Sequence, residues 1–139
     1  LMGVTTTDGR YGSDNFFAGG ATGKVGKKAR ELADTPGAHA LLSTFRKGAF
    51  AYEAPIENGL YSVTLKFVEP GNIAAGERIF DVLANGRPAL EAFDIVLAAG
   101  GVLKAVERSF PVEVSDGVLR LDFKPLQGEA LVSVVEICR

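Results

Sequence analysis

The sequence predicts an all-β fold, an antiparallel β-sandwich with little helix. Apolar and polar residues alternate along several short segments, most clearly over residues 61–67, and this period of two is typical of a half-buried strand. Tight-turn signals recur between these segments at regular spacing, as expected for a sandwich of many short strands. The clearest turn signals are Asn58-Gly59, Asn85-Gly86 and Asp116-Gly117.

The expected elements follow from these patterns in chain order. Residues 3–28 are rich in Gly, Thr, Asp and Asn and belong to the part of the chain with the weakest periodicity, and a short helical turn is expected over 24–32. A turn at 35–37 then leads into a region in which strands dominate. Residues 98–102 are expected to form a loop of small residues. The expected strands are 40–44, 49–54, 61–67, 78–84, 88–95, 104–114, 118–123 and 130–137.

Composition excludes several classes of function. The chain of 139 residues is expected to be a single module, 1–139, and Leu1-Met2-Gly3 does not resemble a natural start, so it is expected to be cut from a longer protein. A net charge of −2 argues against a nucleic-acid partner, and the longest apolar run is too short to span a membrane. With one cysteine (Cys138) and one histidine (His39), we expect no disulfide, no Cys-His catalysis, no zinc site and no cofactor.

Chain direction predicts which end of the sandwich carries function. Successive antiparallel strands run up and then down, so the three tight turns are expected to share one end. The longer connections are expected at the opposite end, and rigid scaffolds often carry binding residues on such loops. These connections are Arg46-Lys47, 70–77, 97–103 and 124–129.

Three carboxylates, Glu69, Asp81 and Asp94, are candidates for chemistry. Asp81 and Asp94 each follow a phenylalanine and precede an aliphatic residue, a setting typical of acids that anchor loop backbone amides. Glu69 ends a strand at the long-loop end, where a structural role and a site role are both possible. Nothing resembles a hydrolase site with partners beside these acids, or a phosphate-binding loop, so we expect no enzyme.

The residue types on the loops suit a sugar ligand. Aromatic faces stack on sugars while amide, acidic and basic side chains bind the hydroxyls. The aromatics of the N-terminal third are candidates for stacking, with edge packing as the alternative, and polar residues at the long-loop end are candidates for hydroxyls. The candidates are Tyr11, Phe16, Phe17, Arg46, Glu69, Asn72 and Gln127. The remaining strand aromatics are assigned to the core, namely Phe50, Tyr52, Tyr61, Phe67, Phe80, Phe110 and Phe123.

The order of motifs over most of the chain resembles malectin-like domains. The segments that carry the resemblance are 58–69, 78–86, 93–106, 110–117 and 131–137. The resemblance implies a jelly-roll-like sandwich that binds oligo- or polysaccharide, often appended to the catalytic domain of a bacterial glycosidase and therefore periplasmic or extracellular. In animal malectin an adjacent pair of ligand aromatics follows the strand that ends here at Glu69, but this chain has Pro70-Gly71-Asn72. A second ligand tyrosine corresponds to Leu42, and the family's opening strand has no clear match in 1–7.

The sequence therefore predicts non-catalytic carbohydrate binding by an accessory module of a polysaccharide-degrading enzyme. The alternative is a structural or protein-interaction domain that keeps the fold and has lost the sugar site. The missing aromatics favour this alternative.

Overall fold

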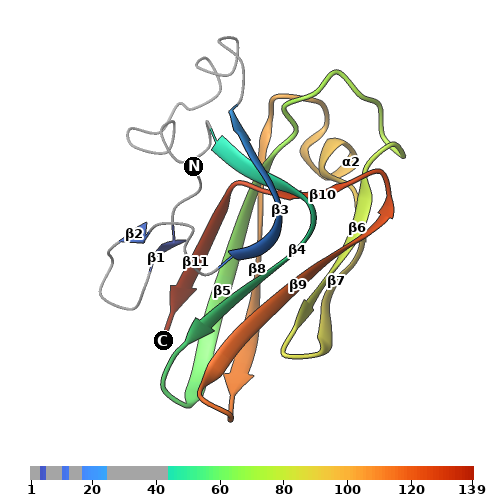
Figure 1. Ribbon diagram of the computed structural model, residues 1–139. Coiled ribbons are helices and arrows are strands. Elements are labelled where there is room, and N and C mark those ends of the chain that lie inside the picture. The colour runs from blue at the N-terminus through green and yellow to red at the C-terminus, as the bar shows by residue number, and fades with distance from the viewer. Residues whose placement is uncertain (1–3, 6–10, 13–16, 25–43) are drawn as a thin grey trace.

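The computed structural model describes residues 4–5, 11–12, 17–24 and 44–139, and these form two packed β-sheets (Figure 1). The five-stranded sheet has the order β2-β1-β11-β5-β8, and the six-stranded sheet has the order β10-β4-β9-β6-β7, with β3 pairing β4. The predicted β-sandwich is confirmed. The strands are β1 (Val4–Thr5), β2 (Tyr11–Gly12), β3 (Phe17–Lys24), β4 (Thr44–Pro55), β5 (Gly59–Val68), β6 (Ile79–Ala84), β7 (Arg87–Phe93), β8 (Ala105–Val114), β9 (Val118–Gln127), β10 (Ala130–Val132) and β11 (Val134–Cys138).

The strand pairs are antiparallel except for β1, which pairs with β11 in parallel. The strand β1 is thus present at the start of the chain, where the family's opening strand had no clear sequence match. After β10 the chain passes through the buried Ser133 and continues as β11 in the other sheet.

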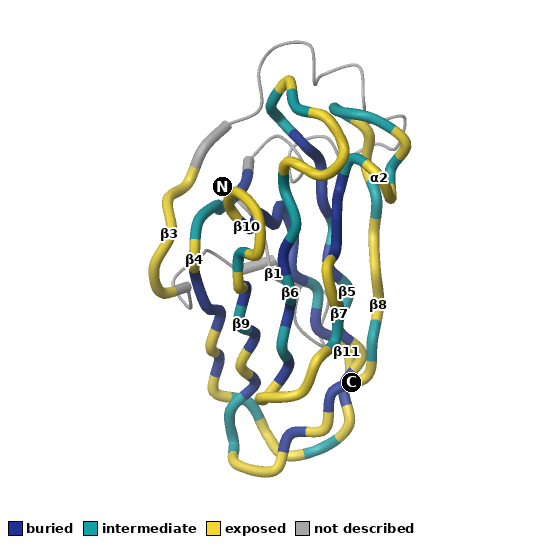
Figure 2. The backbone as a smooth tube through the Cα atoms, turned by 90° about the vertical axis from the view of Figure 1, so that its right-hand side faces the viewer, coloured by how far each residue is buried: buried dark blue, intermediate teal, exposed yellow. Residues whose placement is uncertain are grey.

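The alternation of the sequence is reproduced in the burial of the strands (Figure 2). Along β5, the residues Tyr61, Val63, Leu65 and Phe67 are buried and face the other sheet. The aromatics assigned to the core are buried as expected, except Phe110, which is only partly buried and packs against the core's edge. Burial also raises the pKa of Tyr52 to about 12, so its phenol stays neutral within the core.

The three tight turns share one end of the sandwich, as chain direction predicted (Figure 1). Hydrogen bonds join them directly: Ile56 N–H donates to Gly117 O at 2.9 Å, and Gly117 N–H donates to Asn58 Oδ1 at 2.8 Å. The Asn85 amide donates to Val118 O at 3.3 Å. We call this the turn end, and the opposite end, with the connections 69–78, 94–104 and 128–129, the loop end.

Four sequence expectations are corrected. Residues 46–47 lie within β4 because Gly48, at φ +116°, bends the strand without ending it. Residues 124–127 extend β9, with Pro125 opposite Phe80 in a shifted register. Residues 95–99 form a short helix, α2 (Ile95–Ala99), where strand and loop were expected. Residues 17–24 form strand β3, where the weak periodicity indicated no strand. The expected elements over 25–43 lie outside the described residues.

None of the described helices has the length and apolar character needed to cross a bilayer.

Candidate functional site

A buried ion pair anchors the loop end. Glu69 follows β5 and is fully buried, and Arg78 precedes β6 with a side chain that is 13% exposed. The Arg78 Nε–H donates to Glu69 Oε1, and Nη2 lies 3.3 Å from Oε2. The same guanidinium donates from Nη1 to the backbone oxygen of Glu129 at 2.8 Å. One arginine therefore ties the end of β5, the 70–78 loop and the β9–β10 connection together.

A second carboxylate fixes the neighbouring loop. Asp94 is 7% exposed and accepts from Leu97 N–H at 3.1 Å, which caps the N-terminus of α2. Its other oxygen accepts from Gly76 N–H at 2.6 Å, so α2 and the 70–78 loop share one anchor. Gly100, at φ +86°, ends the helix in the left-handed region that favours glycine. The prediction that Asp94 binds loop amides is confirmed.

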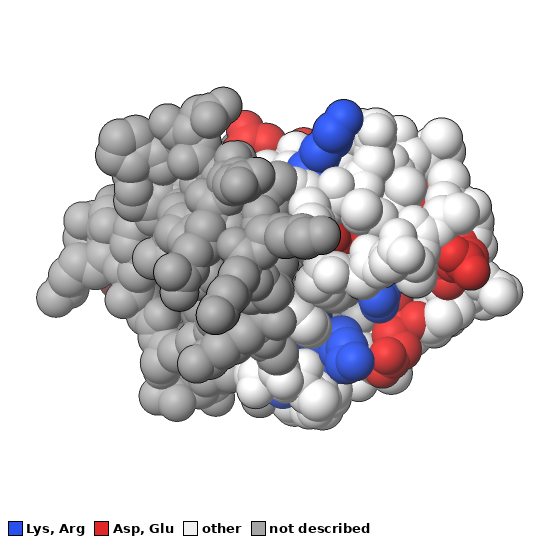
Figure 3. All heavy atoms as spheres, turned by 90° about the horizontal axis from the view of Figure 1, so that it is seen from above, with Lys and Arg blue, Asp and Glu red and all other residues white. Residues whose placement is uncertain are grey.

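The surface that these anchors present is largely uncharged. Seen from above, the described part of the loop end is mostly neutral, with a few separate groups of charged side chains (Figure 3). Helix α2 presents Leu97, which is 74% exposed, and residues 74–76 of the neighbouring loop are also exposed. All aromatics in 44–139 lie within strands, and none of them is classed as exposed.

The structure separates the predicted sugar-binding residues. Asn72 is exposed on the 70–78 loop, and Gln127 is exposed where β9 ends, opposite Ile79 of β6. Glu69 lies beneath them with both oxygens accepting internal hydrogen bonds, including one from Gly71 N–H at 3.0 Å. The Glu69 carboxylate is buried and already accepts internal hydrogen bonds, so it holds the loop in place. It does not reach the surface, and the expectation that it contacts a sugar hydroxyl is therefore not met.

The other three candidates lie on strands of both sheets. Arg46 is half-buried in β4, and its Nη1 donates to Gly19 O, so it joins β3 to β4. The backbone of Phe17 lies opposite Tyr52, toward the turn end of β4. Tyr11 lies in β2 of the other sheet, paired with Thr5. The side chains of Tyr11 and Phe17, and the whole of Phe16, lie outside the described residues.

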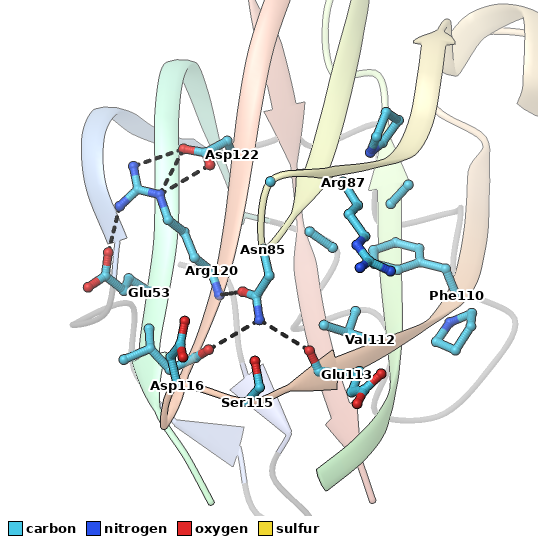
Figure 4. A pocket seen from close by; sticks show the side chains of 16 residues that line it. Glu53, Asn85, Arg87, Phe110, Val112, Glu113, Ser115, Asp116, Arg120 and Asp122 are labelled. Carbon is cyan, nitrogen blue, oxygen red and sulfur yellow. Dashed lines mark hydrogen bonds and ion pairs between the residues drawn. The ribbon is translucent and has the colours of Figure 1, made fainter. Parts of the chain in front are cut away.

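A groove at the turn end was missed by the sequence reasoning. Its cavity volume is about 980 Å³, and it is lined by the β6–β7 hairpin, β8 and the start of β9 (Figure 4). Of the residues predicted to bind carbohydrate, the four whose side chains are described do not line it, namely Arg46, Glu69, Asn72 and Gln127. One sequence signal was available, because Pro111 in the middle of β8 marks an edge strand, and a groove between sheets opens where their edges lie.

No group of three His, Cys, Asp or Glu side chains suited to a metal ion occurs in the described part of the chain.

Comparison with known proteins shows the family. Residues 3–137 match the model of the Malectin domain. Receptor-like protein 4 of Arabidopsis thaliana is 35% identical over 102 residues, which is 70% of this chain but only 16% of that protein. The chain therefore corresponds to a small part of this curated relative.

Solved structures show the same fold. The plant FER structure, in complex with the peptide RALF23 and with LLG2, superposes with a TM-score of 0.80 at 18% identity, covering 99% of this chain and 48% of that one. A Bacteroides uniformis β-glucuronidase superposes with a TM-score of 0.71 at 16% identity, covering 88% and 14%. The chain belongs to the malectin domain family, whose members in plant receptor ectodomains are non-catalytic binding modules.

Proposed function

We propose that the chain is a non-catalytic recognition module of an extracellular protein, and that its loop end binds a protein or peptide partner. The observation that carries this proposal is the loop-end surface itself, which is mostly uncharged and presents Leu97 with 74% of its surface exposed. Protein interfaces are depleted in charge at their centre, where apolar anchors enter pockets of the partner.

The anchored loops support this proposal. Arg78 donates to the buried carboxylate of Glu69, and the nearly buried carboxylate of Asp94 accepts from the N–H groups of Gly76 and Leu97. These contacts hold the 70–78 loop and α2 in place. A surface that is fixed before binding loses less conformational entropy when the partner binds. The position of Leu97 is therefore set by the module alone.

The described residues favour a protein over a sugar. Sugar sites commonly stack the ligand on an aromatic face open to solvent, and within residues 44–139 every aromatic side chain is buried or partly buried. The family relatives point the same way: one is a receptor-like protein, and a structure with this fold contains a bound peptide.

Carbohydrate binding is the second candidate, favoured by the occurrence of this fold within a bacterial β-glucuronidase. In this case the module accompanies a glycosidase in the periplasm or outside the cell. Tyr11 and Phe17 would supply aromatic faces, and Arg46, Asn72 and Gln127 would bind hydroxyls. Glu69 would contribute by fixing the loop that carries Asn72.

The two candidates are separated by selecting a phage-displayed peptide library on the immobilised module and, in parallel, probing a glycan array. We expect enriched peptides whose affinity falls roughly tenfold for Leu97→Ser, since a central apolar anchor contributes about that much. Leu60→Ser is the matched control, because Leu60 is 66% exposed at the turn end. Glycan binding that is abolished by Tyr11→Ala or Asn72→Ala, without peptide enrichment, would overturn the proposal in favour of the second candidate.

A further inference from the structure

The groove at the turn end has walls that are fixed by hydrogen bonds. Asn85, at the tip of the β6–β7 hairpin, donates from its amide to Glu113 O at 3.4 Å and to Val118 O at 3.3 Å. Its Oδ1 accepts from Arg120 N–H at 2.7 Å (Figure 4). The hairpin is thereby joined to both strands β8 and β9, and the groove exists without a ligand. Its volume of about 980 Å³ is ample for several residues of an extended chain.

The groove has an excess of negative charge. Four carboxylates and two guanidiniums line it, which leaves a formal charge of −2. Arg120 is already bound to Glu53 and Asp122, with an Nη2–Oδ1 distance of 2.9 Å to the latter. Glu113 and Asp116 have no ion-pair partner among the described residues. These two carboxylates can therefore bind a cation supplied by a ligand.

An apolar surface adjoins these carboxylates. Pro88 and Ala89 of β7 and Pro111 and Val112 of β8 all line the groove. Phe110 also lines it, and of the aromatics in 45–139 it is the one that is only partly buried. In an extended chain, side chains two residues apart lie on the same face. Phe110 and Asp116 both line the groove, so a strand-like segment can place an apolar side chain on Phe110 while a basic side chain reaches toward the carboxylate of Asp116. Glu113, on the outer face of β8, adds negative charge beside it.

We propose that this groove binds an extended, basic segment of a partner polypeptide, carrying a lysine or arginine two residues from an apolar residue. Arg87, which also lines the groove and has no ion-pair partner among the described residues, donates to the backbone carbonyls of the segment. Nucleic acid is excluded by the negative charge. The groove lies at the opposite end from Leu97, so this site and the loop-end site are independent.

The test uses three dansylated hexapeptides and the ¹⁵N-labelled module. The sequences are Leu-Gly-Lys-Gly-Leu-Lys, the same peptide with glutamate for lysine, and the same peptide with serine for leucine. The first peptide is expected to shift the amide resonances of residues 85–89 and 110–118, and to bind more tightly than the other two. Affinity is expected to fall about fivefold for Glu113→Gln/Asp116→Asn, since exposed charge pairs are individually weak. It is also expected to fall as salt is added.

The matched control is Glu91→Gln/Glu107→Gln, which removes the same charge from exposed positions of β7 and β8 outside the groove. Equal losses of peptide affinity in the two double variants would show that binding responds to net charge alone, and would contradict the proposed site. Equal binding of the glutamate peptide, or resonance shifts confined to 70–78 and 95–103, would overturn it as well. The proposal would also be contradicted if a neutral oligosaccharide shifts the amide resonances of the groove and none of the peptides does.

Discussion

Replacing Arg78 by methionine is expected to lower the free energy of unfolding by about 3–5 kcal/mol, because it leaves the buried Glu69 carboxylate without its counter-ion. Glu69 is fully buried, and two nitrogens of the Arg78 guanidinium donate to it. The substitution also removes the hydrogen bond to Glu129 O, so the β9–β10 connection loses its link to the 70–78 loop. Equilibrium unfolding in urea measures the change.

Two control variants test whether the loss of stability comes from the burial of the Glu69–Arg78 pair. Lys66→Met breaks a pair with Glu136 in which the side chains are 27% and 20% exposed, and it is expected to cost no more than about 1 kcal/mol. The double variant Glu69→Leu/Arg78→Met removes both charges and is expected to regain much of the lost stability. A loss below about 1 kcal/mol for Arg78→Met alone would contradict the anchoring role.

Phe67→Ala is expected to destabilise the fold by about 3–5 kcal/mol, as large core truncations do. Phe67 is fully buried near the loop end of β5, and its ring lies 4.7 Å from that of Phe93 and 5.9 Å from that of Phe80. Phe80 and Phe93 belong to the other sheet, so this cluster joins the two sheets beneath the loops. Removing the central ring leaves a cavity between the sheets, and calorimetric unfolding measures its cost.

The comparison for Phe67→Ala is Phe110→Ala, a substitution of the same size at the partly buried edge of the core. Its cost is expected to be clearly smaller, because surrounding water and side chains can fill the space that the ring leaves. Similar losses for the two variants would show that the sheets are not held together at the Phe67 cluster.

Much of the scaffold could be predicted from local patterns. The alternation of apolar and polar residues identified β5, because its alternating apolar residues lie on the one face of the strand that is buried. The Asn85-Gly86 pair identified the β6–β7 hairpin, where both residues adopt positive φ. Asp81 was correctly predicted to bind a backbone amide, and its Oδ1 accepts from Ala92 N–H at 2.7 Å. In each case the cause lies in the period of one strand or in one hairpin and the two strands that it joins.

The parts that could not be predicted depend on contacts across the fold. The burial of Glu69, for which a structural role and a site role were both open, could not be predicted, because its partner Arg78 directly precedes another strand. Helix α2 was missed although Asp94 and Gly100 are typical capping residues, since five apolar residues between them also fit a strand or loop. The turn-end groove depends on the edges of both sheets, which are separated in sequence by α2 and its flanking loop.

The central claim is that the loop end is a recognition surface fixed before any partner binds. Amide hydrogen exchange of Gly71 and Gly76 in the free protein tests it most directly, because these N–H groups donate to Glu69 and Asp94. We predict that both amides exchange at least about a hundredfold more slowly than in an unstructured peptide. Exchange of both at the unstructured rate would show that the loop is not held by its carboxylate anchors, and would contradict the claim.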